Sequence, residues 1–376
     1  MNDQSTNTVF TQITPVGRGA VATLACCGSA ALTIVDRCLY TDGRLSLKDR
    51  PLASLTYGRW RMASGLGEDL IVVAHDAENV EIHCHGGNVT VELISGVLAE
   101  QGMRKVAPLD FELAKCQSRW QAETNICLGQ ATTQRTAEVL LSQQERLPFW
   151  VSNLRQIIAL GEFNTASQEI QKILAWEDYG RHLLEPRSVV LCGQPNVGKS
   201  SLINRIAGFD RAIVDVTPGT TRDVISQLTA IDGWPIRLMD TAGLRSGTLD
   251  PIETEGIHKT RTLIDQADGV VGVFDASQPW SRIDQQLSEN PAVDLLVFNK
   301  DDIAVDAVRP EGLLVSAISG NGISHFLAEL IGNLIPTHPP QEQPVICLAS
   351  QSDRLRACCE ALSRSDSQSA LDELGV

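Results

Sequence analysis

Basic residues are scarce in this sequence. Of its 376 residues, 31 are Lys or Arg against 46 Asp or Glu, which gives a formal net charge of -15. This balance argues against a broad positive surface that would hold nucleic acid through its phosphates. Any RNA contact should therefore be local or supplied by a partner.

Long hydrophobic runs and cysteine pairs with metal-binding spacing are also missing. No apolar run approaches the roughly 18 residues of a membrane span, and the first eight residues are polar, so we expect a soluble, cytoplasmic protein that contacts no membrane. The ten cysteines include no Cys-x-x-Cys, which indicates reduced thiols rather than a zinc site. His83, Cys84 and His85 are adjacent, but neighbours on a strand point to opposite faces and would not converge on one metal.

The chain is long enough for two or three domains, each with its own core. Apolar runs at 21–24, 70–74 and 80–84 predict strands, and the pattern at 89–98 predicts a helix, which together indicate a small α/β domain. Helical spacing follows over 137–184, where we expect Pro148 and Gly161 to divide the segment into several helices. A further helix is predicted at 346–362.

Between the helical segments, strands alternate with helices. The predicted strands are 188–192, 236–239, 270–274, 295–298 and 313–315. This order predicts an α/β domain with a mostly parallel sheet covered on both faces. The Glu185-Pro186 step and a proline-rich linker at 337–344 bound it. We therefore divide the chain into domains at residues 1–115, 116–186, 187–337 and 338–376, with the third inserted in a helical domain.

A phosphate-binding motif follows the first strand of the inserted domain. Residues 193–200 read Gly-Gln-Pro-Asn-Val-Gly-Lys-Ser, a P-loop pattern that stands between an apolar strand and an amphipathic helix. Its glycines let backbone N–H groups surround phosphates at a helix N-terminus. Lys199 should bridge the β and γ phosphates as a catalytic group, and Ser200 should bind Mg²⁺. The alternative is a chance glycine turn. The predicted phosphate contacts are Asn196, Val197, Gly198, Lys199, Ser200 and Ser201.

The base is predicted from the segment that begins Asn299-Lys300 and includes Asp302. A carboxylate at Asp302 can accept from guanine N1–H and the exocyclic amine together, whereas adenine offers no matching donor pair. The segment ends a strand, where ligands bind in open α/β sheets. A solvated charged turn is the alternative, but Ser316-Ala317 follows the next strand, where a GTPase has its second base-contacting loop.

Two further segments complete a set for nucleotide hydrolysis. Asp240-Thr241-Ala242-Gly243 supplies a Mg²⁺-linked carboxylate and a glycine amide for the γ phosphate. Between it and the P-loop, residues 217–223 are typical of a switch loop in which a threonine hydroxyl completes the magnesium shell. The four motifs in this order predict a protein that binds GTP and hydrolyses it to GDP and phosphate.

Leu244 directly follows residues 240–243, where many small GTPases have a glutamine that orients the attacking water. An apolar side chain cannot do that, so another group must orient the water and neutralise charge. Asn196, residues 219–223, residues 240–245 and residues 253–257 together resemble the MnmE (TrmE) family of tRNA-modification GTPases. The resemblance implies a Ras-like P-loop GTPase domain inserted in a helical domain, preceded by a small folate-binding-like α/β domain that dimerises.

The resemblance also implies that a potassium ion takes the place of an arginine finger. The potassium ligands carried over by position are Asn196, Asp215, Thr217 and Thr220. Asp215 stands where the family usually has threonine, a change that a backbone carbonyl ligand survives. Thr221 matches the second magnesium ligand, and Glu253 matches the glutamate that acts on the water through a bridging molecule. Asn196 could instead bond loop backbone, and Glu253 could be a helix N-terminal carboxylate.

The N-terminal resemblance covers residues 14–21 and 81–87. Of the family's contacts to 5-formyltetrahydrofolate, only Glu81 matches, because Ala25 holds the place of an arginine and the Asn-Gly-Lys segment is not recognisable over 111–132. The family ends in Cys-x-Gly-Lys, whereas this sequence ends Leu-Gly-Val. The resemblance thus implies GTP, Mg²⁺ and K⁺, and it does not extend through the folate site.

Two hypotheses of different class follow. In the first, a homodimer works in tRNA wobble-uridine modification with an FAD protein of the MnmG type, and touches tRNA locally or indirectly. In the second, the protein is a diverged paralogue that acts as a GTP-dependent regulatory or assembly switch without folate-dependent tRNA chemistry. GTP binding is expected under either.

Overall fold

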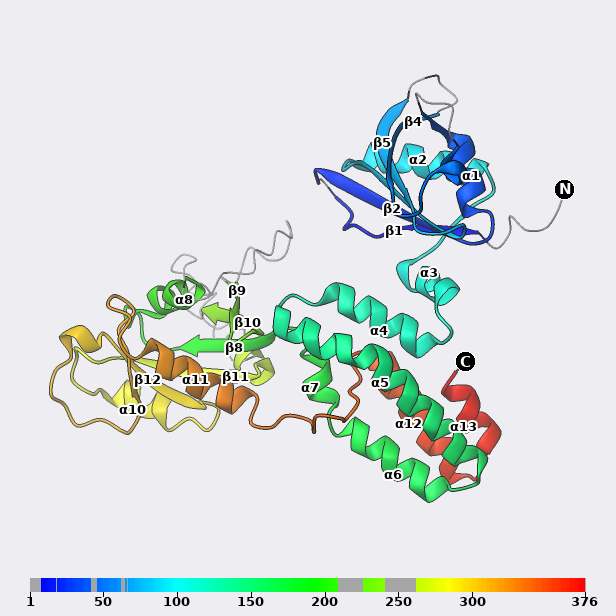
Figure 1. The fold of residues 1–376 in the computed structure, drawn as a ribbon. Coiled ribbons are helices and arrows are strands. Elements are labelled where there is room, and N and C mark those ends of the chain that lie inside the picture. Colours follow the sequence, from blue (N-terminus) through cyan, green and yellow to red (C-terminus); the bar gives the residue numbers. More distant parts are fainter. Residues whose placement is uncertain are drawn as a thin grey trace, which may run out of the picture. The chain divides into compact units, whose positions relative to one another are not determined.

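The computed structural model describes residues 8–17, 19–41, 46–61, 65, 67–208, 226–240 and 262–375. The chain forms two compact units, Met1–Ile126 with Gly375–Val376 and Cys127–Leu374. Each unit has its own sheet and its own hydrophobic core (Figure 1).

The first unit is an α/β domain around a seven-stranded sheet in the order β3-β4-β5-β6-β2-β1-β7. Its elements are β1 Val9–Gln12, β2 Val21–Cys27, α1 Ala31–Cys38, β3 Leu39–Tyr40, the 3₁₀ turn η2 Leu47–Asp49, β4 Leu55–Trp60, β5 Glu68–Ala74, β6 Asn79–His85, α2 Asn88–Glu100, β7 Arg104–Lys105 and α3 Pro108–Lys115, after which α4 Arg119–Gln130 leads into the second unit. Neighbouring strands are antiparallel except β1 and β7. Leu24, Val72 and Ile82 point to the core shared with α1 and α2, so the alternating residues of β6, Glu81 and His83, lie on the opposite face.

Helices on both sides of the inserted domain pack together in the second unit. They are α5 Gln134–Ala159, α6 Phe163–Leu174, α7 Glu177–Arg181, α12 Ala349–Ser363 and α13 Ser367–Glu373. Figure 1 shows α5, α6, α12 and α13 side by side, although α6 and α12 are far apart in sequence.

Two helix predictions need correction. Pro148 lies inside α5 and does not divide it. A proline removes one backbone hydrogen bond, but Leu147, Val151 and Leu154 are buried on either side of it and hold the helix in its packed position. The break predicted at Gly161 is present, since α6 begins at Phe163. The helix predicted at 346–362 begins at Ala349, because Gln351 accepts from the N–H groups of Cys347 and Leu348 and so caps its first turn.

The inserted domain has a six-stranded sheet in the order β13-β12-β11-β8-β10-β9. Its elements are β8 Arg187–Cys192, α8 Lys199–Ala207, β9 Ser226–Ile231, β10 Trp234–Asp240, β11 Gly269–Asp275, α10 Arg282–Ser288, β12 Leu295–Asn299, the 3₁₀ turn η4 Asp301–Ile303, β13 Leu313–Leu314 and α11 Ile323–Leu334. The five predicted strands are present and parallel. The sequence analysis missed β9, which pairs antiparallel with β10 at the edge of the sheet.

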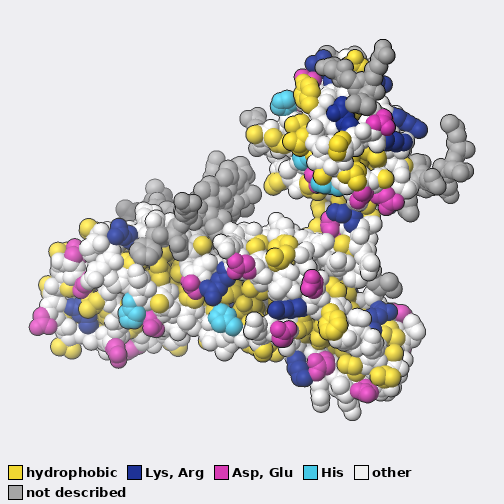
Figure 2. Space-filling model, in the orientation of Figure 1, with side chains coloured by type: hydrophobic (Ala, Val, Ile, Leu, Met, Phe, Trp, Pro, Cys, Tyr) yellow, Lys and Arg dark blue, Asp and Glu magenta, His cyan; other side chains and the backbone are white. Residues whose placement is uncertain are grey.

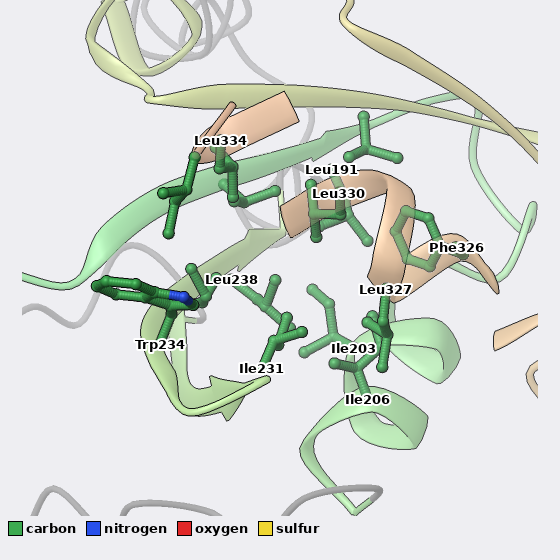
Figure 3. Close-up of a cluster of buried hydrophobic side chains, with 14 of the residues drawn as sticks. Leu191, Ile203, Ile206, Ile231, Trp234, Leu238, Phe326, Leu327, Leu330 and Leu334 are labelled. Carbon is green, nitrogen blue, oxygen red and sulfur yellow. The ribbon is translucent and has the colours of Figure 1, made fainter. Parts of the chain in front are cut away.

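Both faces of this sheet are covered. On one face, Ile203 and Ile206 of α8 and Phe326 and Leu330 of α11 belong to the same buried cluster as Leu238 (Figure 3). On the other, Phe274 and Phe298 pack with Trp280 and Leu287 at α10. Because β8 and β10 to β13 are parallel, their carboxyl ends lie at one edge of the sheet, and the loops that follow them meet there.

The inserted domain is joined to the helices through the turn between β9 and β10. Arg135 of α5 donates to the carbonyl oxygen of Asp232 at 2.7 Å and pairs with its carboxylate. The same guanidinium lies 5.2 Å from the ring centre of Trp234. Trp234 is stacked on His338 and meets Tyr179 edge to face. We call these five residues the Trp234 joint.

Candidate nucleotide-binding site

The P-loop connects the end of β8, at Cys192, to the start of α8, at Lys199. Asn196 and Gly198 have left-handed backbone angles, with φ of 64° and 93°. A Cβ at Gly198 would lie 2.3 Å from Nδ2 of Asn299. Glycine at position 198 thus lets the phosphate loop approach the end of β12.

Lys199 is buried within this loop, with 4% of its surface exposed. Its ammonium group donates to the carbonyl oxygens of Gly193 and Gln194, both at 3.0 Å. The positive charge therefore lies inside the curve of the loop, where the phosphates of a nucleotide bind in P-loop proteins.

Two oxygen groups meet beside the lysine. The hydroxyl of Ser200 donates to Oδ2 of Asp240, and Asp240 is 1% exposed. Asp240 ends β10, the parallel neighbour of β8, so sheet register brings the two motifs together. A serine hydroxyl and a carboxylate are hard oxygen donors of the kind that Mg²⁺ binds.

Two other P-loop side chains, Asn196 and Gln194, differ in their contacts. Asn196 is exposed, and its side chain has no hydrogen-bond partner among the residues that the structure describes. Gln194 donates to Asp284 at 2.7 Å and to Ser281 at 3.1 Å, at the N-terminal capping box of α10. The sequence analysis did not predict the contact between Gln194 and α10, because it joins segments about ninety residues apart.

The predicted base-binding residues lie around Asn299, which is 2% exposed. Its Nδ2 donates to the carbonyl oxygen of Val197 at 2.9 Å, and its Oδ1 accepts from the N–H of Ala317 at 3.0 Å. Ser316, which is fully buried, donates to Oδ1 of Asp302 at 2.5 Å. The phosphate loop and both base loops are thus connected through one amide side chain.

Lys300 has a partner that the sequence analysis missed. Its ammonium group pairs with Oδ2 of Asp275 at 2.6 Å, across the ends of β12 and β11. Burial opposes ionisation of Asp275, but hydrogen bonds from Lys300 and Ser277 outweigh it and hold the pKa of this carboxyl below its usual value. A carboxylate at the end of the neighbouring parallel strand is the signal that could have identified it.

Several predicted site residues fall outside the described part of the chain. They are Asp215, Thr217, Thr220 and Thr221 of the switch segment, Thr241, Ala242 and Gly243 after β10, and Glu253. The described site therefore consists of the P-loop, Asp240 and the two base loops.

Glu81 lies in the first unit, beside a cavity of about 430 Å³ between β2, β6 and α3. Its two carboxylate oxygens face Nε2 of His75 at 3.3 Å and Nε2 of His83 at 3.4 Å. Ala25 is buried under Phe111 at the same cavity, where the resemblance places an arginine. Glu81 is thus already engaged by two imidazoles.

The surface shows no segregation of charge on the face drawn in Figure 2, where basic and acidic side chains are interspersed.

Among the described residues, no helix has the length and apolar character needed to cross a bilayer. Cys84 is buried while His83 lies on the opposite face of β6, as their alternation predicted.

Comparisons with known proteins identify the family of this chain. The family model described as "50S ribosome-binding GTPase" matches residues 188–300. Several curated relatives carry the name "tRNA modification GTPase MnmE". The one from Geobacillus thermodenitrificans is 32% identical, over 79% of this chain and 73% of that protein. Those from Geotalea uraniireducens and Syntrophotalea carbinolica are 30% and 32% identical, over 95% and 93% of this chain and 88% and 86% of their own lengths. The chain is thus a GTP hydrolase, and it belongs to the tRNA modification GTPase MnmE family.

Proposed function

We propose that this GTPase acts in tRNA wobble-uridine modification, with the nucleotide phosphates on loop 193–200 and guanine between Asn299, Asp302 and Ala317. The observation that carries the site is the position of Asn299, bonded both to the P-loop and to the second base loop. The names of the relatives support a role in tRNA modification. Guanine would present N1–H and its amine to Asp302, and its carbonyl would accept the Ala317 N–H in place of Oδ1 of Asn299.

For phosphate binding, Lys199 would exchange its two carbonyl partners for β and γ phosphate oxygens. Ser200 and Asp240 fit Mg²⁺, because a hydroxyl and a buried carboxylate already lie side by side. The ion, when bound, neutralises charge on the phosphates. Ser201, Thr221 and residues 241–243 would complete the phosphate and magnesium contacts.

Potassium would bind next to the P-loop through Asn196, Asp215, Thr217 and Thr220. The alternative role for Asn196 is a hydrogen bond from its side chain to the backbone of the loop. Asn196 is exposed, has a left-handed backbone and makes no such bond to the described part of the loop, which supports the potassium role. Potassium would supply the positive charge that an arginine finger gives elsewhere. Glu253 would act on the attacking water.

The N-terminal cavity fits an anionic folate poorly. Among the described residues that line it, three carboxylates, Asp76, Glu78 and Glu81, outnumber one lysine, Lys115, and Ala25 offers no charge. The glutamate carboxylates of 5-formyltetrahydrofolate would therefore be repelled. We propose that this chain uses GTP, Mg²⁺ and K⁺ without folate bound in its own cavity.

This cavity favours a second candidate function, in which a diverged paralogue serves as a GTP-dependent regulatory or assembly switch.

Under the first candidate function, tRNA modification, we propose a homodimer in the cytoplasm that works with an MnmG-like FAD protein. The cytoplasmic location is supported by the ten cysteines, all of which are free thiols.

The pathway is tested by deleting the gene in its source organism and measuring the modified wobble uridines of total tRNA by mass spectrometry. Loss of the modification, restored by the intact gene and not by a Lys199→Ala copy, supports the tRNA role. An unchanged nucleoside profile would reject that role and favour the switch.

A further inference from the structure

The second base loop, residues 316–320, is anchored by more than its own turn. Ser316 accepts from the N–H of Ser319 through its hydroxyl and from the N–H of Gly320 through its carbonyl oxygen. These contacts close the loop around Ser316, and Ala317 lies inside it with its N–H on Asn299. They do not by themselves fix the loop against the phosphate-binding helix.

Arg205, near the end of α8, makes that connection. Its Nη2 donates to the carbonyl oxygen of Ser319 at 3.2 Å. A Cβ at Gly320 would lie 2.1 Å from the same nitrogen, so the guanidinium packs directly on the glycine backbone. Gly320 has φ of +86°, which glycine adopts without strain.

Because α8 starts at Lys199 and carries Arg205 seven residues into its nine, one rigid helix links the phosphate end of the site to the base end. Asn299 makes the other link, through Val197. Removal of Arg205 would leave Ser316 and Asp302 in place and free the far side of the loop. The N–H of Ala317 would then meet the guanine carbonyl less often in the correct geometry.

We propose that Arg205 is a positioning residue for guanine recognition, which acts by holding loop 316–320 against α8. This inference rests on the proposed guanine site. The proposed role of Arg205 concerns recognition of the base and not of the phosphates. Loss of Arg205 should therefore weaken the binding of guanine nucleotides without slowing hydrolysis of bound GTP.

The test is the effect of Arg205→Ala on nucleotide affinity and on steady-state hydrolysis. We expect the Kd for GDP and the KM for GTP to rise about 3- to 10-fold, the range that one hydrogen bond provides. The Kd for ADP should not change, and kcat should change less than about two-fold, because the phosphate contacts are intact. Arg205→Lys, which keeps a donor, should restore part of the affinity.

Arg237→Ala is the matched control. Arg237 is an exposed arginine of β10, so its removal changes the net charge equally without touching the loop. An unchanged Kd for GDP in Arg205→Ala, or equal losses for GDP and ADP, would overturn the proposal. A fall in kcat together with a lowered melting temperature would also overturn it, in favour of a structural role.

Gly320→Ala approaches the same contact from the other side. In the wild-type background the new methyl group collides with Arg205 and is also strained by the positive φ. In the Arg205→Ala background only the strain remains, so the loss of GDP affinity caused by Gly320→Ala should be about 3-fold smaller. Equal losses in both backgrounds would contradict the contact.

The guanine site itself is checked separately by the wild-type preference for GDP over ADP. If that preference is absent, the proposed site fails. If it is present and Arg205→Ala leaves it intact, only the positioning role fails.

Discussion

Asp302 is held by a buried serine before any base arrives. The hydroxyl of Ser316 donates to one carboxylate oxygen and so orients the other for a ligand. A carboxylate fixed in this way can discriminate between bases, because an adenine would leave it desolvated and unpaired.

Replacement of Asp302 by alanine should therefore remove guanine preference. We expect the ratio of kcat/KM for GTP over ATP to fall by about 100-fold, as charged hydrogen bonds are worth about 1.5–3 kcal/mol each. Asp301→Ala is the control, since Asp301 accepts from Asn321 at the surface. A ratio that stays at the wild-type value in Asp302→Ala would refute the role.

The site residues found from sequence all belong to motifs that are local in the chain. The P-loop and Asn299 to Asp302 are recognised by spacing, because their chemistry requires certain residue types within a few positions. Arg205 and Gln194 carry no such signal, since their partners are long-range. Asp275 is indicated only by its place at the end of a parallel strand, not by motif spacing. The roles of all site residues remain predictions until measured.

At the scale of elements, β8 and β10 to β13 were predictable because buried parallel strands are continuous apolar runs. The edge strand β9 reads Ser-Gln-Leu-Thr-Ala-Ile, with few buried positions, and gave no such run. Pro148 misled the prediction for α5, because tertiary packing outweighs one lost hydrogen bond. Domain boundaries also remain a prediction.

The Trp234 joint predicts a measurable loss of stability. Arg135→Ala removes a hydrogen bond to Asp232, a mostly exposed ion pair and a cation–π contact. We expect unfolding to become easier by about 1–2 kcal/mol, with most of the loss from the first and last of these contacts. Urea unfolding measures it, with Arg237→Ala as control; equal stability of the two variants would contradict the joint.

A second contact joins α7 to the sheet through a buried histidine. His182, 3% exposed, faces Oδ1 of Asp268 at 3.3 Å. Burial opposes ionisation of Asp268, but hydrogen bonds from His182 and Ser188 outweigh it and lower its pKa well below the usual value. A lowered folded pKa means that the stabilisation is present above the ordinary pKa and is lost as pH falls towards the folded value.

Asp268→Asn should therefore unfold more easily at pH 7, by about 1–2 kcal/mol. The difference from wild type should be present at pH 7 and shrink below the ordinary pKa of 3.8. Urea titrations at several pH values test this. A difference that is absent at pH 7, or that grows in acid, would show that the hydrogen bonds to Asp268 do not stabilise the protein.

At the scale of the whole molecule, the two units differ in how closely they match the MnmE family. The nucleotide unit has its P-loop, Asp240 and base loops in one place. The first unit keeps Glu81, but in a cavity whose charge is mostly negative. We therefore infer that GTP binding in this protein does not depend on folate binding to the first unit.

Calorimetry with 5-formyltetrahydrofolate tests that inference. We expect no saturable binding to the intact chain at concentrations where GDP titrates one site per chain. The GDP titration is the control for folded protein. Stoichiometric folate binding that Glu81→Ala abolishes would contradict the proposed mismatch.

The most direct test of the central claim is GTP hydrolysis by the purified chain in KCl against NaCl at equal ionic strength, with Mg²⁺ present. The account predicts strong stimulation by potassium and its loss in Asn196→Ala, with GDP affinity retained. Equal, low rates in both salts would contradict potassium-assisted hydrolysis and leave a GTPase that depends on some other group.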